Sequence, residues 1–145
     1  MRFAVSIIFA LILSGCASTS SVQFSPSQHY AISVQSNLFD AVRIVKNDIT
    51  LFNDGKALGF IRIEPIPSDA PSTSELINTL RSASDSESVE TEALELYPGF
   101  KGFSAKVRGY QTGYLINEKN PSSMLIFSFP EGYFESVAKT ISSGI

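Results

Sequence analysis

Apolar and polar residues alternate in the chain after Gln28, and this pattern predicts β-strands. Residues 30–35 carry large apolar side chains at every second position, which is the period of a strand with one covered face. Residues 40–46 and 49–52 are rich in Val and Ile and are predicted strands as well, with one helical turn at residues 38–42 as the alternative. This part of the chain is therefore expected to form a sheet.

A turn signal follows at Asn53-Asp54-Gly55, whose residues tolerate positive φ angles. It lies between residues 49–52 and the apolar run at residues 56–63, so the two runs are predicted to form a β-hairpin. Prolines then end the sheet signal, because proline cannot donate a hydrogen bond to a neighbouring strand. These prolines are Pro65, Pro67 and Pro71.

A helix is predicted directly after the prolines, at residues 73–84. Ser72 and Glu75 have the spacing of a capping box, in which each side chain bonds the backbone of the other residue. Apolar residues follow at helical spacing. They are Leu76, Ile77, Leu80 and Ala83.

Four apolar segments in the second half of the chain predict further strands, at residues 89–97, 103–110, 114–117 and 124–129. The third lies between turn signals at Gly113 and at Asn120-Pro121. The last is the most apolar, and both of its faces carry large apolar side chains. A strand that is covered on both faces belongs at the centre of a sheet with helices on at least one side. We therefore expect residues 124–129 to be the central strand.

The last predicted element is a C-terminal helix that can cover this strand. Its apolar stripe has helical spacing and consists of Phe134, Val137, Ala138 and Ile141. The whole pattern predicts one α+β domain at residues 29–145, with a mostly antiparallel sheet of about six or seven strands, a mid-chain helix and a C-terminal helix.

This order of elements resembles the PsbP-like and DcrB-like group of small α+β domains. The matching parts are residues 71–80, 99–107 and 124–141, and no diagnostic motif accompanies them. The resemblance implies an accessory or scaffold domain, because the group is known for such roles rather than for a shared catalytic site.

The first residues of the chain have the pattern of a signal peptide. Arg2 is the only charged residue before Cys16, and residues 3–13 are apolar except for Ser6. This run is shorter than the roughly 20 residues that a transmembrane helix needs, so residues 1–15 are predicted to be a removed leader.

The end of the leader resembles the bacterial lipobox, since Leu13-Ser14-Gly15-Cys16 fits that pattern at all four positions. The resemblance implies diacylglycerol transfer to the Cys16 sulfur, cleavage before Cys16 and acylation of the new N-terminus by a chain such as palmitate. Cys16 is the only cysteine, so it has no intramolecular disulfide partner. We expect a lipoprotein that is anchored to a membrane without spanning it.

Residues 17–28 are rich in Ser and uncharged, and we interpret residues 16–28 as an acylated cysteine followed by a flexible tether. A flexible chain of this length has an end-to-end distance of about 20 Å. Ala17, rather than Asp, follows the cysteine. If the host has two membranes, resemblance to known sorting rules implies the periplasmic side of the outer membrane.

Charge excludes one class of partner. The formal net charge is −3, and removal of Arg2 with the leader makes the domain slightly more acidic. Nucleic acid is therefore not an expected partner, because its binding depends on many Lys and Arg residues that neutralise phosphates. An envelope protein is the expected partner.

Motifs for catalysis or cofactor binding are missing from the sequence. His29 is the only histidine, and neither a Gly-x-Ser-x-Gly elbow nor a nucleotide-binding glycine motif is present. A zinc site would lack thiolates and a second imidazole once Cys16 is acylated. We therefore predict no catalytic residue, no metal site and no cofactor.

One segment has the composition of a binding surface. Residues 97–110 mix aromatic, glycine and basic residues. Aromatic side chains beside Lys and Arg are common where proteins bind protein or glycan partners. The pattern favours a strand pair that buries its aromatics. If some of these aromatics are exposed instead, the candidate binding residues are Phe100, Lys101, Arg108, Tyr110 and Tyr114.

Two classes of function fit these features. The first is a non-catalytic binding or assembly module held at the membrane, and the second is a hydrolase of envelope polymers with a carboxylate pair. A shallow aromatic patch would favour the module, and a deep cleft with two close acidic side chains would favour the enzyme. The pattern also predicts that Phe127→Ala costs more stability than Phe100→Ala in the glycine-rich turn.

Overall fold

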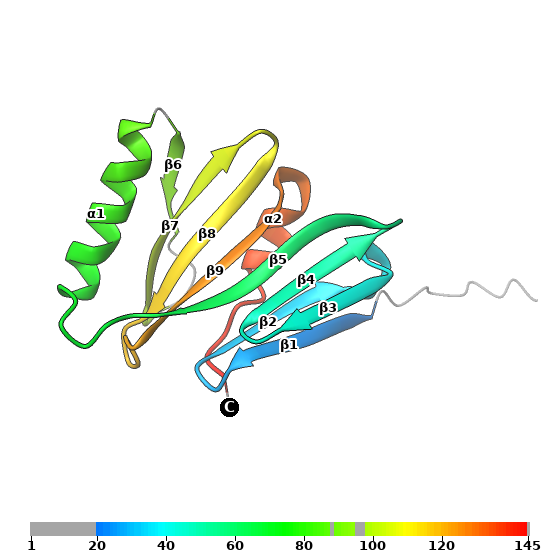
Figure 1. The fold of residues 1–145 in the computed structure, drawn as a ribbon, viewed down its shortest axis with the longest axis horizontal. Coiled ribbons are helices and arrows are strands. Elements are labelled where there is room, and N and C mark those ends of the chain that lie inside the picture. The colour runs from blue at the N-terminus through cyan, green and yellow to red at the C-terminus, as the bar shows by residue number, and fades with distance from the viewer. Residues whose placement is uncertain (1–19, 88, 95–97, 145) are drawn as a thin grey trace, which may run out of the picture.

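The chain folds as the predicted α+β arrangement, an antiparallel sheet with one helix in mid-chain and one near the C-terminus (Figure 1). The computed structural model describes residues 20–87, 89–94 and 98–144. Within these residues, seven strands form one sheet in the order β3-β4-β5-β9-β8-β7-β6, and β1 and β2 form a separate two-stranded sheet.

The elements follow one another in this order: β1 (Ser21–Ser27), β2 (Tyr30–Gln35), a 3₁₀ helix (Ser36–Leu38), β3 (Ala41–Val45), β4 (Asp48–Asn53), β5 (Lys56–Pro65), α1 (Thr73–Ser86), β6 (Glu90–Ala93), β7 (Phe100–Val107), β8 (Tyr110–Asn117), β9 (Ser123–Pro130) and α2 (Glu131–Ala138).

The central position of β9 is confirmed, because it is the middle strand of the seven and pairs with β5 and β8. Leu125, Phe127 and Phe129 are fully buried on one face of this strand. Met124 and Ile126 lie on the other face and are half-buried. We call the face that carries Phe127 the inner face of the sheet and the opposite one the outer face.

The inner face is covered by α2 and by the two-stranded sheet. The rings of Phe127 and Phe134 of α2 stack with their centroids 5.0 Å apart and an angle of 7° between their planes. Tyr30 of β2 reaches the main sheet, where its hydroxyl donates to the Ser123 carbonyl at 2.7 Å and accepts from the Asn117 amide at 3.0 Å. Burial raises the pKa of the Tyr30 hydroxyl.

The outer face is covered only over part of its width, where α1 lies on β6 and β7. Ile77 of α1 packs there with Phe103 and Ile116. The predicted capping box starts this helix, since the Glu75 amide donates to Ser72 Oγ and the Ser72 amide donates to the Glu75 carboxylate at 3.1 Å. In Figure 1, β3 and β4 lie well away from α1.

The predicted tether is wrong for Ser21–Ser27, which form β1 and pair antiparallel with β2. Phe24 is buried in the inner core, and its ring centroid lies 6.0 Å from that of Phe39. Pro26 is compatible with this strand because β1 has a partner on one side only within its two-stranded sheet. The domain therefore begins before His29. Residues 1–19, with the predicted leader and Cys16, lie outside the described part.

The predicted strand at residues 103–110 is confirmed up to Val107, within β7, but its end is wrong because the chain then turns into β8. Arg108 and Gly109 have φ angles of 52° and 80° and form a two-residue turn between β7 and β8. Gly113, which was expected to mark a turn, lies inside β8. A Cβ atom at Gly113 would collide with the ring of Phe127, so this glycine makes room for the central phenylalanine.

Other elements differ from the expected ones in their bounds. The strand expected at residues 89–97 is reduced to β6, with residues 95–97 outside the described part. α1 runs slightly beyond residues 73–84, and the alternative helical turn at residues 38–42 is not formed. Ile141 is buried as expected, but it follows the end of α2.

The expected surface position of Phe100 is wrong. Gly99, with a φ angle of 96°, forms the turn, and Phe100 is already the first residue of β7. Its side chain is only 9% exposed, and its ring centroid lies 6.1 Å from that of Tyr30. Phe100 is therefore a core residue of the inner face.

Candidate functional site

The five residues predicted to bind a partner do not form one surface. Lys101 lies near the start of β7, whereas Arg108 and Tyr110 lie around the turn at its other end. A strand of this length spans about 20 Å or more. Phe100 and Tyr114 point to opposite faces of the sheet.

Phe100 and Tyr114 serve packing rather than a binding surface. Phe100 belongs to the inner core. The ring of Tyr114 stacks on Phe103 beside α1, with the centroids 4.8 Å apart and 13° between the planes. Burial raises the pKa of the Tyr114 hydroxyl.

Lys101, Arg108 and Tyr110 are exposed. Lys101 Nζ lies 2.8 Å from the Glu118 carboxylate and donates to Ser74 Oγ at 3.1 Å, so it links β8 to the start of α1. Tyr110 is 40% exposed and lines a hollow on the outer face.

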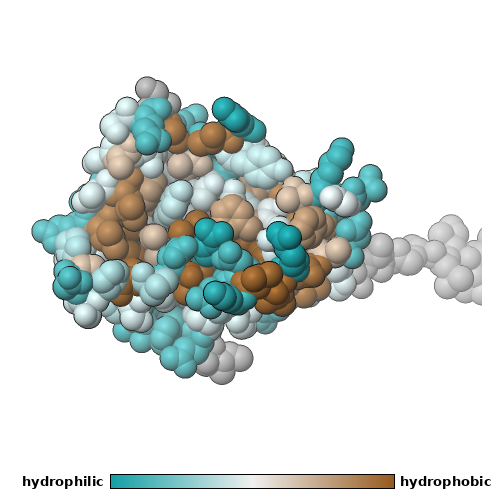
Figure 2. All heavy atoms as spheres, in the orientation of Figure 1, coloured by the Kyte–Doolittle hydropathy of each residue, from teal (hydrophilic) through white to brown (hydrophobic). Residues whose placement is uncertain are grey.

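The part of the outer face beyond α1 is the strongest candidate for a binding surface, and we call it the open face. It consists of the outward side chains of β3, β4, β5 and β9. Cross-strand register places them in two rows, Arg43-Thr50-Phe60-Ser128 and Val45-Asp48-Arg62-Ile126. Figure 2 shows hydrophobic and hydrophilic residues interspersed over this part of the surface.

Two arginines of the open face lie over phenylalanine rings. The Arg62 guanidinium is 5.7 Å from the ring centroid of Phe60, and that of Arg43 is 5.4 Å from the ring centroid of Phe52. Arg62 also donates to both Asp48 carboxylate oxygens, at 2.6 and 3.0 Å, and this hydrogen bonding raises the pKa of Arg62. The edges of the Arg62 guanidinium are thus engaged by Asp48, whereas the cation–π contact of Arg43 uses only the face of its guanidinium and leaves the N–H edges to other partners.

A hollow of about 270 Å³ lies in the middle of the open face, lined by Asp48, Thr50, Ala57, Gly59, Phe60, Arg62, Tyr110 and Ser128. The Tyr110 hydroxyl closes one side of it and donates to the Ala57 carbonyl at 3.4 Å. Small-molecule sites usually measure about 300–1,000 Å³, so this hollow suits a single side chain of a partner better than a whole ligand.

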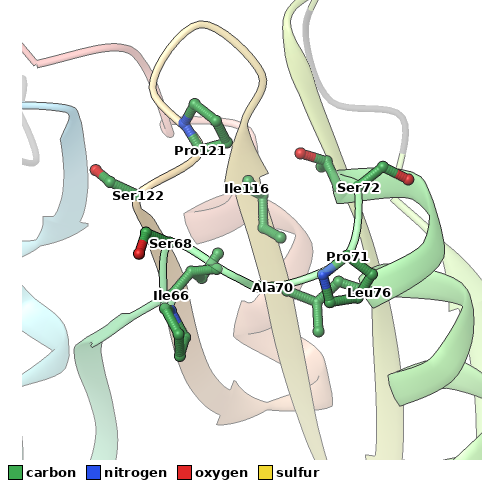
Figure 3. A pocket seen from close by; sticks show the side chains of 11 residues that line it. Ile66, Ser68, Ala70, Pro71, Ser72, Leu76, Ile116, Pro121 and Ser122 are labelled. Carbon is green, nitrogen blue, oxygen red and sulfur yellow. The ribbon is translucent and has the colours of Figure 1, made fainter.

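A larger hollow of about 470 Å³ lies at the start of α1 (Figure 3). Its apolar side chains include Ile66, Leu76 and Ile116, which come from the loop after β5, from α1 and from β8. Its lining has hydroxyl groups but no ionisable side chain. The Ser72 hydroxyl is engaged in the capping box. This hollow therefore offers apolar contact but no group for acid–base chemistry.

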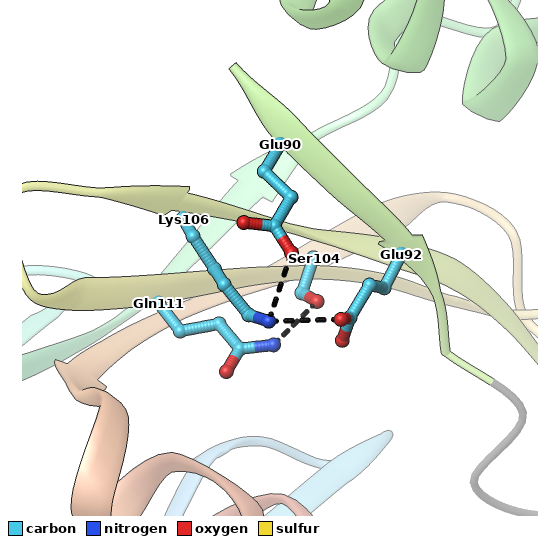
Figure 4. A network of polar contacts seen from close by, with 5 residues as sticks. All are labelled: Glu90, Glu92, Ser104, Lys106 and Gln111. Carbon is cyan, nitrogen blue, oxygen red and sulfur yellow. Dashed lines mark hydrogen bonds and ion pairs between the residues drawn. The ribbon is translucent and has the colours of Figure 1, made fainter.

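The closest arrangement to a carboxylate pair lies at the β6 side of the inner face (Figure 4). Lys106 Nζ lies 2.8 Å from Glu92 Oε1 and 3.3 Å from Glu90 Oε1. Hydrogen bonds to Glu92 and then Glu90 raise the pKa of Lys106. Beside them, Gln111 Nε2 donates to the buried Ser104 hydroxyl at 2.8 Å.

This arrangement does not suit glycoside hydrolysis. One of the two carboxyl groups must be protonated to act as a general acid. Here the Lys106 ammonium group contacts both carboxylates and lies between them, where the scissile bond of a substrate would have to be. Both side chains are also more than half exposed rather than set in a cleft. These contacts are better explained as cross-strand ion pairs that join the short edge strand β6 to β7.

Further features bear on the chemistry of the described residues. No group of three or more His, Cys, Asp or Glu side chains lies close enough there to hold a metal ion. None of the helices described is both long and apolar enough to cross a membrane.

No known protein family matches the chain, and no curated protein is significantly similar to it.

The open face was missed by the sequence analysis, although its signal is present in the chain. In residues 48–52 the apolar Ile49 and Leu51 alternate with outward residues, and the same alternation continues in residues 60–63. This period of two indicated one covered and one uncovered face. The aromatic and basic composition of residues 97–110 is more conspicuous in the sequence, but it belongs largely to a packed strand pair.

Proposed function

We propose that this chain is an acylated lipoprotein of the bacterial cell envelope whose domain is a non-catalytic binding module for another envelope protein. In a host with two membranes, its place is the periplasmic side of the outer membrane. The observation that carries the binding role is the open face, where two arginines lie over phenylalanine rings around a hollow the size of a side chain.

The anchor is supported by the sequence Leu13-Ser14-Gly15-Cys16. Cys16→Ala should abolish labelling with a radioactive or clickable fatty acid and release the protein from the membrane fraction. Unchanged labelling and fractionation of this variant would contradict the lipoprotein proposal.

The binding role is supported by the composition and shape of the open face. Aromatic residues and Arg are enriched in protein interfaces and in their energetic hot spots. The hollow of the open face is smaller than a substrate site, and the two carboxylates of that face, Asp48 and Glu64, both contact Arg62. These features favour a docking surface over an active site.

The test is photo-crosslinking in intact cells from a reactive residue placed at Thr50, in the middle of the open face. A discrete crosslinked protein is expected, and Phe60→Ser in the same chain should reduce its yield at least about tenfold, as for a hot-spot residue. Tyr133→Ser is the matched control, because Tyr133 is an exposed aromatic on α2, away from the open face.

Two results would contradict the binding role. One is the absence of any crosslinked protein at Thr50 in cells that contain the correctly folded chain. The other is an equal loss of crosslinking for Phe60→Ser and Tyr133→Ser, because a surface that binds through Phe60 cannot respond equally to both changes.

A further inference from the structure

We propose that two copies of this chain pair through β3, strand to strand, so that their seven-stranded sheets join into one continuous sheet. This proposal is independent of the open-face partner, because it rests on the edge of the sheet rather than on its face. The occupant of the β3 edge is a second copy, in antiparallel orientation about a two-fold axis at Arg43.

β3 is an edge strand with less than the usual protection, because Arg43 is the only charged residue in it. All five of its residues are exposed, and Val42, Ile44 and Val45 are 40%, 66% and 55% exposed. Natural edge strands are usually short, charged or interrupted by proline or a bulge, because their unpaired backbone groups can pair with another chain. β3 contains no proline, and its pairing with β4 shows no bulge.

The opposite edge of the sheet, β6, is better protected against pairing with another chain than β3. β6 has four residues, and Glu90 and Glu92 place two charges on it. This edge is protected in the usual way. β3 therefore has the properties of a strand that pairs, and β6 those of a strand that is kept from pairing.

The sequence of β3 is complementary to itself. In antiparallel pairing with Arg43 opposite its own copy, Ala41 faces Val45 and Val42 faces Ile44. Asp40 and Lys46 flank the strand, Lys46 in the turn to β4 with a φ angle of 54°, and this register brings their opposite charges to the same end of the pair. Each of these pairings occurs twice across the two-fold axis. Aliphatic pairs directly across strands are stabilising, and opposite charges near each other at the strand ends add to them.

Neighbouring registers lack this match. A shift that sets Ile44 opposite itself places Val42 opposite Lys46, and a shift that sets Val42 opposite itself places Ile44 opposite Asp40. A shift by a single residue would turn the side chains of one copy to the wrong face of the joined sheet. The register at Arg43 is thus the one in which both charged ends and all the aliphatic residues find suitable partners.

The like charges at the axis do not prevent this register. Arg43 points to the outer face, and its guanidinium lies over the ring of Phe52 on the neighbouring strand β4, on the side away from the second copy. The side chain is exposed, so solvent and salt screen the repulsion between the two copies.

The test uses a single cysteine at the two-fold axis in the full chain, expressed in bacteria with its own leader. Cα atoms directly opposite each other in an antiparallel pair are about 4.5–5.5 Å apart, which a disulfide can span. Under mild oxidation, Arg43→Cys should form a disulfide-linked dimer. Thr50→Cys is the matched control, because two copies of Thr50 would be about three strand spacings, or roughly 14 Å, apart.

Charge reversal then tests the register. In the Arg43→Cys background, Asp40→Lys or Lys46→Asp should lower the dimer yield about tenfold, because each brings like charges together at both ends of the strand pair. The double reversal should restore it. The Lys46→Asp arm is needed because Asp40 also accepts a hydrogen bond from the Asp54 amide, so Asp40→Lys changes the fold locally.

The outcomes of these experiments distinguish pairing of two copies through β3 from binding of a different protein there and from the proposed acylation of Cys16. An equal dimer yield for Arg43→Cys and Thr50→Cys, or no rescue by the double reversal, overturns the pairing. A disulfide from Arg43→Cys to a different protein also overturns it, since the edge then belongs to that partner. A dimer of the unchanged chain through Cys16 would instead speak against acylation and leaves the comparison of positions 43 and 50 intact.

Discussion

The two halves of the seven-stranded sheet share one inner core but differ on their outer face. Under α1, the outer side chains Phe103, Ala105 and Ile116 are buried and form a second core. On β3, β4 and β5, the outer positions carry Arg43, Thr50 and Arg62, which remain at least partly exposed.

This difference separates stability from binding. The half under α1 is covered on both faces, so its outer residues contribute to the fold. The other half already gains its stability from Ile49, Leu51 and Ile61 on the inner face. Its outer residues are therefore free to be selected for contact with a partner, and changes there should alter binding more than folding.

The largest effects are expected in the shared inner core. Phe127→Ala should cost about 3–5 kcal/mol of the free energy of unfolding, because Phe127 is fully buried against Phe134. Phe100→Ala should now be costly as well, at about 3 kcal/mol, because Phe100 packs on Tyr30. Denaturant midpoints test both. A loss below about 1 kcal/mol for Phe100→Ala would show that this residue is at the surface after all.

The contrast between the two outer halves should be nearly as large. Ile116→Ala, beneath α1, should cost about 2–5 kcal/mol, because Ile116 is fully buried. Phe60→Ala, on the open face, should cost about 1 kcal/mol or less, because its ring is only partly buried and lies outside both hydrophobic cores. Urea unfolding of both variants measures the difference, and equal losses would remove the distinction between the halves.

A smaller effect is expected where α1 begins. Ser72→Ala should cost about 1 kcal/mol, because it removes the side-chain acceptor of the Glu75 amide at the helix N-terminus. The thermal midpoint should fall, whereas crosslinking from Thr50 should be unchanged. Lost crosslinking in this variant would mean that the open face depends on α1.

The smallest effect concerns Tyr30, whose ionisation changes the stability of the domain only at alkaline pH. The raised pKa of Tyr30 means that the folded domain holds this proton more tightly than the unfolded chain, whose tyrosines ionise near 10. The stability linked to Tyr30 is complete below that pH and is lost as the pH rises through the raised folded pKa. Tyr114 has a shift of the same sign. The alkaline loss of stability should therefore shrink in Tyr30→Phe, and an unchanged pH profile would contradict the role of burial.

Much of the fold could be predicted from the sequence because the pattern was regular. The run at residues 124–129 carries apolar side chains on both faces, which only a central covered strand requires. The capping box at Ser72 and Glu75 fixed the start of α1 because both partners of the motif lie within four residues. Local patterns of this kind do not depend on the rest of the chain.

The errors arose where distant residues decide the outcome. Gly113 has the local signature of a turn, yet it lies in a strand because the ring of Phe127 occupies the space above it. Ser21–Ser27 have the composition of a linker, and they form a strand because the side chain of Phe24 packs into the inner core. The position of Phe100 likewise depends on Tyr30, which lies in the separate sheet.

The contacts of β2 also bear on the order in which the domain can form. Its Tyr30 hydroxyl bonds the backbone of Asn117 and Ser123, and Ser33 bonds Thr140, 107 residues further along the chain. Such long-range contacts form late, because a large loop must close before they add stability. The first strands therefore depend on the last segment of the chain, and a polypeptide that is still being synthesised from its N-terminus cannot yet close this domain.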